Sequence, residues 1–360
     1  MVHAANKCIY FITVYKCNNF KLNISFSLVL LSFPNNTQKA YLLFRFLALY
    51  KNMAPSFLSV ARFVEALLRR RFSSAGLSLQ TLSIDSETTI QFWGPPPSSS
   101  SENTQKPSLL LLHGFGPSAV WQWSHQVKPL SHFFRLYVPD LVFFGGSSSS
   151  GENRSEMFQA LCMGKLMEKL EVERFSVVGT SYGGFVAYNM AKMFPEKVEK
   201  VVLASSGVNL RRSDNEAFIA RAKCHRIKEV MLPASATDLR RFSGMVSSKR
   251  LDYVPDFVLN DFCQKMYSEK REEKAELLEG LSIGKDDKTN VSPIQQDVML
   301  IWGEQDQVFP LKMAHDLKEM LGTKATLKVI QKTSHIPQTE KSKEFNGFVM
   351  SFLLPPSPSP

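Results

Sequence analysis

Short, mostly apolar runs alternate with amphipathic stretches between residues 79 and 354. Apolar runs of this length are typical of strands that are covered on both faces of a parallel sheet. We predict such strands at Ser108–Leu112, Phe134–Val138, Phe175–Val178, Val198–Ala204, Val298–Trp302 and Ala325–Ile330. Stretches between them, roughly 120–130, 155–170 and 185–193, read as helices. Strands that alternate with helices predict an α/β fold, with a mostly parallel sheet and helices on both faces.

The pattern changes at two places in this region. Leu79–Ile84 and Thr88–Trp93 alternate apolar and polar residues, which predicts a hairpin. After residue 207 no strongly apolar run occurs until the sheet resumes, and charged helical stretches dominate. We interpret this segment as a helical cap inserted into the sheet. The expected divisions are a core in two parts, 79–207 and 295–354, a cap at 208–294, and a Pro/Ser tail at 355–360.

Residues 1–78 form a leader and an amphipathic helix that need not belong to the fold. The most apolar runs of the leader, Ile24–Phe33 and Tyr41–Tyr50, are shorter than the roughly 18 residues that span a bilayer. The leader also lacks the usual arrangement of a signal peptide, which is a basic start, a single apolar run and a cleavage site with small residues. We therefore expect residues 1–52 to lie outside the folded protein, with Met53 as an alternative start.

Residues 56–72 place apolar side chains at helical spacing and end close to three consecutive arginines. Three interpretations stay open for this helix: an organelle transit peptide, a peripheral membrane contact, or packing against the folded body. We expect an intracellular protein, either cytosolic or peripherally membrane-associated, with organelle targeting by the N-terminal segment as the alternative.

The formal charge of +10 is concentrated near the N-terminus. Residues 1–75 contain ten Lys or Arg and one acidic residue, so the rest of the chain is close to neutral. A neutral body lacks the basic surface that nucleic acid requires, and we expect no such partner. The five cysteines show neither C-x-x-C pairs nor metal-site spacing, which predicts free thiols and no metal site. Free thiols favour a reducing compartment.

Candidate chemistry begins at Gly179-Thr-Ser181-Tyr-Gly183, which lies between a predicted strand and a predicted helix. A serine in so sharp a turn is exposed only if its neighbours two residues away on each side lack side chains, and Gly179 and Gly183 meet this need. The spacing is that of a nucleophile elbow, with Ser181 as the nucleophile.

A second loop, His113-Gly114-Phe115-Gly116, directly follows the predicted strand 108–112. Gly114 and Gly116 would let its backbone approach a carbonyl oxygen held at the serine. The N–H groups of Phe115 and Tyr182 are the candidate donors of an oxyanion hole, which stabilises charge that appears only in the transition state.

Two acids, Glu304 and Asp306, follow the predicted strand 298–302. We favour Asp306 as the residue that orients a catalytic histidine, with Glu304 as the alternative. His335 lies in the loop after the last predicted strand, and the order Ser181, Asp306, His335 is the one expected for a triad on such a sheet.

The cap carries bulky apolar residues that either line a substrate pocket or form the cap's own core. Together with the residue after His335, the candidate pocket residues are Phe242, Met245, Phe257, Phe262 and Ile336.

These ordered motifs resemble the α/β-hydrolase superfamily over residues 79–354, in particular its monoacylglycerol-lipase-like and plant carboxylesterase-like members. The loop that begins at His113 is also similar to that of hydrolases that cleave carbon–carbon bonds. Those enzymes typically carry Trp after the catalytic histidine, where this chain has Ile336. Epoxide hydrolases and haloalkane dehalogenases use Asp as nucleophile, in contrast to Ser181.

The resemblance implies a serine hydrolase that needs no cofactor and acts through an acyl-enzyme. The apolar candidates favour a small apolar substrate, such as a medium-chain ester or a monoacylglycerol. A carbon–carbon hydrolase of vinylogous diketones and a ligand receptor on the same fold are the alternatives. The sequence makes no prediction of the oligomeric state.

Overall fold

A computed structural model describes residues 59–97 and 106–355. The expectations for the leader, including the alternative start at Met53, lie outside the described residues. Within the described ranges, no helix is both long and apolar enough to cross a membrane.

A single sheet of nine strands organises the chain, in the order β1-β2-β4-β3-β6-β7-β8-β9 with β5 paired to β2. The strands from β4 to β9 along this order pair in parallel, and the β1–β2 hairpin and the β2–β4 and β2–β5 pairs are antiparallel. The bounds are β1 Ser78–Ser83, β2 Thr88–Gly94, β3 Ser108–Leu112, β4 Arg135–Pro139, β5 Ser148–Ser149, β6 Phe175–Thr180, β7 Val198–Ala204, β8 Asp297–Gly303 and β9 Ala325–Ile330.

Helices cover both faces of the sheet, and alternate residues of the strands divide between two cores. In β3, Leu110 and Leu112 join the core under α5, α6 and α12, whereas Leu109 and Leu111 join the core under α3, α4 and α14. The bounds are α3 Ala119–Trp123, α4 Val127–Ser131, α5 Glu156–Lys169, α6 Tyr182–Met193, α12 Leu311–Leu321, α13 Pro337–Glu340 and α14 Ser342–Leu353. This is the α/β architecture expected from the sequence.

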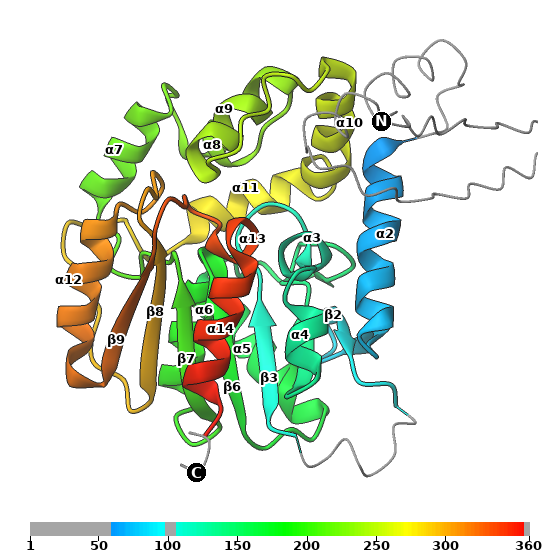
Figure 1. Cartoon of the computed structure of the whole chain (residues 1–360), viewed down its shortest axis with the longest axis vertical. Helices are drawn as coiled ribbons and strands as arrows, with labels where there is room; N and C mark the ends of the chain where they lie inside the picture. The colour runs from blue at the N-terminus through cyan, green and yellow to red at the C-terminus, as the bar shows by residue number, and fades with distance from the viewer. Residues whose placement is uncertain (1–58, 98–105, 356–360) are drawn as a thin grey trace, which may run out of the picture. The chain divides into compact units, whose positions relative to one another are not determined.

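Five further helices lie between β7 and β8, in the segment interpreted as a cap. Figure 1 shows them gathered beyond the carboxyl ends of the sheet strands. Their bounds are α7 Arg212–Arg221, α8 Ile227–Met231, α9 Ala236–Val246, α10 Asp256–Tyr267 and α11 Arg271–Gly280. The cap therefore covers the edge of the sheet at which an α/β fold places its ligands.

Helix α2, Val60–Ser74, packs on the folded body, which is the third interpretation given above. Ala61 and Phe72 are fully buried, and Phe72 contacts Trp93 with ring centroids 5.2 Å apart. The helix also reaches the cap, because the N–H of Ala61 donates to the Asp261 carboxylate at 2.8 Å. Its opposite side is exposed, and a membrane contact there stays a prediction.

The single helix expected at 120–130 is wrong, since the chain forms two short helices, α3 and α4. Pro129 explains the break: inside one continuous helix it would remove a backbone hydrogen bond and clash with the preceding turn. In α4 it lies in the first turn, where no intrahelical partner is needed.

Candidate active site

Ser181 lies between β6 and α6 with φ 51° and ψ −121°, a backbone conformation that L residues rarely adopt. The glycines on either side of Ser181 are required because a side chain at either position would clash with backbone. A Cβ on Gly179 would lie 2.2 Å from the carbonyl oxygen of Gly183, and one on Gly183 would lie 2.3 Å from that of Leu112. The turn is held from β7, because the Ser206 hydroxyl donates to the carbonyl oxygen of Ser181 at 2.7 Å.

Three side chains from separate loops form a continuous hydrogen-bonded chain. Ser181 Oγ lies 2.9 Å from His335 Nε2, and His335 Nδ1 lies 2.9 Å from one Asp306 oxygen and 3.1 Å from the other. With the ring proton on Nδ1, the serine hydroxyl donates to Nε2. The three residues meet because β6, β8 and β9 are parallel and end at the same edge of the sheet.

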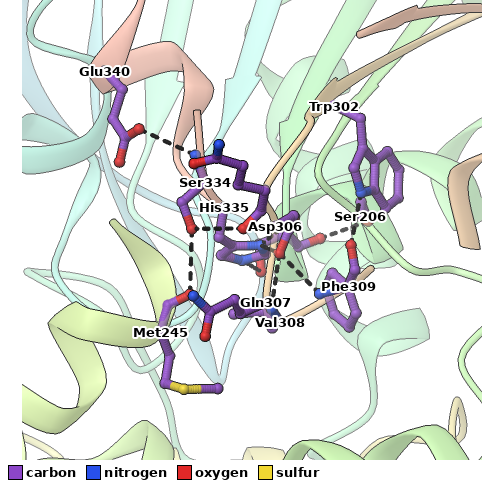
Figure 2. Close-up of polar contacts among 12 residues, drawn as sticks. Ser206, Met245, Trp302, Asp306, Gln307, Val308, Phe309, Ser334, His335 and Glu340 are labelled. Carbon is purple, nitrogen blue, oxygen red and sulfur yellow. Dashed lines mark hydrogen bonds and ion pairs between the residues drawn. The ribbon is translucent and has the colours of Figure 1, made fainter. Parts of the chain in front are cut away.

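Asp306 is held on its far side by backbone. Its Oδ1 accepts the N–H groups of Val308 at 2.8 Å and Phe309 at 2.9 Å (Figure 2). The Asp306 side chain is inaccessible to solvent. The alternative acid, Glu304, is turned away from the histidine. Its carboxylate instead accepts the N–H of Lys332 at 2.9 Å.

The loop after β3 lies directly against Ser181. A Cβ on Gly114 would come within 3.1 Å of Ser181 Cβ, so this loop can approach only as glycine backbone. Within the described residues, the N–H of Phe115 has no hydrogen-bond partner, and Tyr182 begins α6, where N–H groups point out of the helix. Both donors expected for an oxyanion hole are therefore unused by the protein's own acceptors.

His113 and Gln122 fix the shape of this loop. The buried ring of His113 donates from Nδ1 to the Gly114 carbonyl at 2.8 Å and accepts the N–H of Leu141 at Nε2. Burial lowers the pKa of His113 to about 4, so the ring is neutral, as this pattern requires. The Gln122 amide bonds both the N–H and the carbonyl of Gly114. Sequence reasoning missed Gln122, which no motif marks.

The candidate pocket residues have different surroundings. Phe242 and Met245 of α9 are buried, and the Met245 carbonyl accepts a long hydrogen bond from the Ser334 hydroxyl next to His335. Phe262 packs edge-on against Trp121 of α3, which places it between cap and core. Phe257 and Ile336 are half-buried.

The profile of the alpha/beta hydrolase fold family matches residues 107–342. The chain belongs to this family. The match confirms the fold class and the superfamily expected from the sequence, and with them the hydrolase class.

Two curated relatives of this α/β hydrolase illustrate the range of the family. A pimeloyl-acyl-carrier-protein methyl ester esterase from Aliivibrio fischeri is 25% identical over 249 residues, or 68% of this chain and 93% of that protein. A dihydrolipoyllysine-residue acetyltransferase component of an acetoin cleaving system from Cupriavidus necator is 26% identical over 253 residues, or 68% of this chain. The match spans only 63% of that component's own length.

Solved structures share the fold at lower identity. A candidate lipase from Acinetobacter baumannii superposes with a TM-score of 0.67 at 20% identity, over 80% of this chain and 95% of its own. A dienoate hydrolase from Rhodococcus superposes with a TM-score of 0.62 at 22% identity, over 76% and 98%. Identities this low show the fold alone.

Proposed function

We propose that this α/β hydrolase cleaves carboxylic esters through an acyl-enzyme on Ser181. The observation that carries the proposal is the hydrogen-bonded chain from Ser181 Oγ through His335 to Asp306, with contacts of 2.9 Å at both ends of the imidazole. A hydroxyl paired with a base, and a base oriented by a buried acid, are the parts that nucleophilic acyl transfer needs.

In the proposed reaction, His335 Nε2 takes the proton of Ser181 as Oγ attacks the ester carbonyl. Asp306 holds the proton on Nδ1 and stabilises the imidazolium that forms. The backbone N–H groups of Phe115 and Tyr182 receive the negative oxygen of the tetrahedral intermediate. Collapse releases the alcohol, and a water activated by the same histidine then hydrolyses the acyl-enzyme.

We further propose a medium-chain apolar substrate beneath the cap, taken as residues 208–294. Apolar groups border the nucleophile: Phe309 packs edge-on to the His335 ring at 5.4 Å, and Phe115 packs edge-on to Tyr182 at 5.9 Å. An acyl chain needs such surfaces more than it needs polar partners. Carbon–carbon bond hydrolysis is less favoured, because this chain has Ile336 where enzymes of that class typically carry Trp.

A series of p-nitrophenyl esters of increasing acyl length tests the proposal, assayed beside a dienoate ring-fission product. We expect turnover that peaks at medium length and is abolished by Ser181→Ala with the circular dichroism unchanged. A kcat/KM for the dienoate above that of every ester would favour carbon–carbon hydrolysis. Stoichiometric binding of esters without steady turnover would favour a receptor.

A further inference from the structure

Two polar side chains of the cap, Tyr267 and Lys274, are buried, and in the described ranges of the chain they lack the partners that their chemistry calls for. Each is only 3% exposed. Tyr267 ends α10, and Lys274 lies in α11, so both come from the part of the cap that faces the loop after β3. Buried polar groups are usually hydrogen-bonded and buried charges are usually paired, and exceptions mark sites for a ligand.

The ammonium group of Lys274 is a buried cation that has no ion-pair partner among the described residues. Among the described residues, its only hydrogen bond is a long one of 3.4 Å to the Met266 carbonyl, and it forms no ion pair. It lies instead over the ring of Phe144, 5.4 Å from the centroid. Nearby Lys265 shows the usual arrangement, since it pairs with Glu65 at 2.7 Å.

The Tyr267 hydroxyl lies next to the proposed oxyanion loop. A Cβ built on Gly116 would be 3.7 Å from this oxygen, and in the described part of the chain no side chain or backbone group hydrogen-bonds it. Its ring packs edge-on to Phe242 of α9 at 6.3 Å.

Phe144 connects Lys274 to the residues around Ser181. Its ring contacts Phe115 with centroids 5.4 Å apart and Tyr182 with centroids 6.4 Å apart, and these two residues carry the proposed oxyanion donors. Lys274 lies above Phe144, and Tyr267 lies beside Gly116. The two residues are close to each other, because Lys274 Nζ donates to the carbonyl of Met266, the residue before Tyr267. A cation and a hydroxyl together select an acceptor with negative charge, and a carboxylate satisfies both.

We propose that Lys274 and Tyr267 form an acid-binding corner of the substrate pocket, and that the natural ester carries a carboxylate bound there. This inference rests on the proposed ester hydrolysis, and it replaces the expected neutral substrate by an acidic ester with an apolar chain between its two ends.

The electrostatics around Lys274 agree with this assignment. Burial lowers its pKa to about 8, so the amine is largely protonated at neutral pH and loses its proton in mild alkali. The nearby charges on its own segment are of both signs, Glu269, Lys270, Arg271 and Glu273. His113, which faces it from the loop after β3, is neutral.

The test compares matched esters that differ only in a terminal carboxylate, placed on the acyl side in one pair and on the alcohol side in another. We expect kcat/KM of the unaltered protein to favour the acidic ester in at least one pair by roughly tenfold or more. Lys274→Met should remove that preference by raising KM for the acidic ester. Lys285→Met, which removes an exposed cap charge, is the matched control and should change neither ester.

The pH dependence of KM and a second variant, Tyr267→Phe, test the same proposal independently. KM for the acidic ester should rise above pH 8 in the unaltered protein, as Lys274 deprotonates, and stay flat in Lys274→Met. Tyr267→Phe, which keeps the ring, should weaken the same preference if Lys274→Met does not fold. Two results would overturn the acid-binding corner alone. One is a preference for the neutral ester in both pairs, and the other is a preference for the acidic ester that persists in Lys274→Met. Failure to turn over any ester overturns the proposed function.

Discussion

Asp306 and Glu304 illustrate how two acids in one loop acquire different properties. Asp306 is buried, and its carboxylate accepts two backbone N–H groups in addition to the His335 ring. Glu304 is half-buried and only ties the loop to the backbone of Lys332. The fixed position of Asp306 lets it hold one tautomer of the histidine, which a mobile surface acid would not do.

Asp306→Asn should therefore lower kcat by up to roughly 10⁴-fold, the scale known for a serine-protease triad, because the amide favours the wrong tautomer of His335. Glu304→Gln keeps an acceptor for Lys332 and should change kcat far less. Steady-state kinetics with one medium-chain ester measure both, and the opposite ranking would move the orienting role to Glu304.

The three residues of the proposed triad could be chosen from the sequence because their order and their places after strands are visible along the chain. It could not predict the surroundings of the site. Gln122 lies in an amphipathic helix with no motif, and Lys274 belongs to the charged segment Arg271–Gly280, which is typical of a surface helix. Which of its charged side chains is buried depends on how the cap helices pack, and the local sequence pattern does not determine that packing.

Among the elements, α2 departs most from what the sequence led us to expect. We expected a segment that need not belong to the fold, and the structure packs it on the folded body. The sequence shows an amphipathic helix with a basic end, which is compatible with a membrane surface, a targeting signal or a packed helix. The structure places Phe72 in the core beside Trp93 and leaves Phe63 59% exposed. The two aromatic residues of one helix thus offer a matched comparison.

Phe72→Ala should lower the free energy of unfolding by about 3–5 kcal/mol, because it leaves a cavity beneath α2. Phe63→Ala should change it by less than about 0.5 kcal/mol, since that ring has no buried contact to lose. Urea denaturation of both variants provides the comparison. Equal, small effects would mean that α2 does not belong to the stable fold.

Strands were easier to predict than helices for a physical reason. β3, β6 and β8 are covered on both faces over nearly their whole length, so their sequences are mostly apolar and their ends are sharp. The helix expected at 120–130 failed because an amphipathic pattern continues across Pro129, although the backbone cannot.

For the molecule as a whole, the parallel sheet brings the ends of β3, β6, β8 and β9 together, and the cap covers them (Figure 1). One edge then holds Ser181, His335 with Asp306, and two N–H groups and a cation that have no acceptor or anion among the described residues. This combination is the physical basis of the proposed ester hydrolysis and of the proposed preference for an acidic ester.

Labelling with a fluorophosphonate probe, followed by peptide mapping, tests the central claim most directly, because the probe reacts only with a serine that its surroundings have activated. We predict one labelled peptide, modified at Ser181, and loss of the label in Ser181→Ala and in His335→Ala with folding retained. Label that persists on another serine in Ser181→Ala, or no label on a protein that turns over esters, would contradict the account.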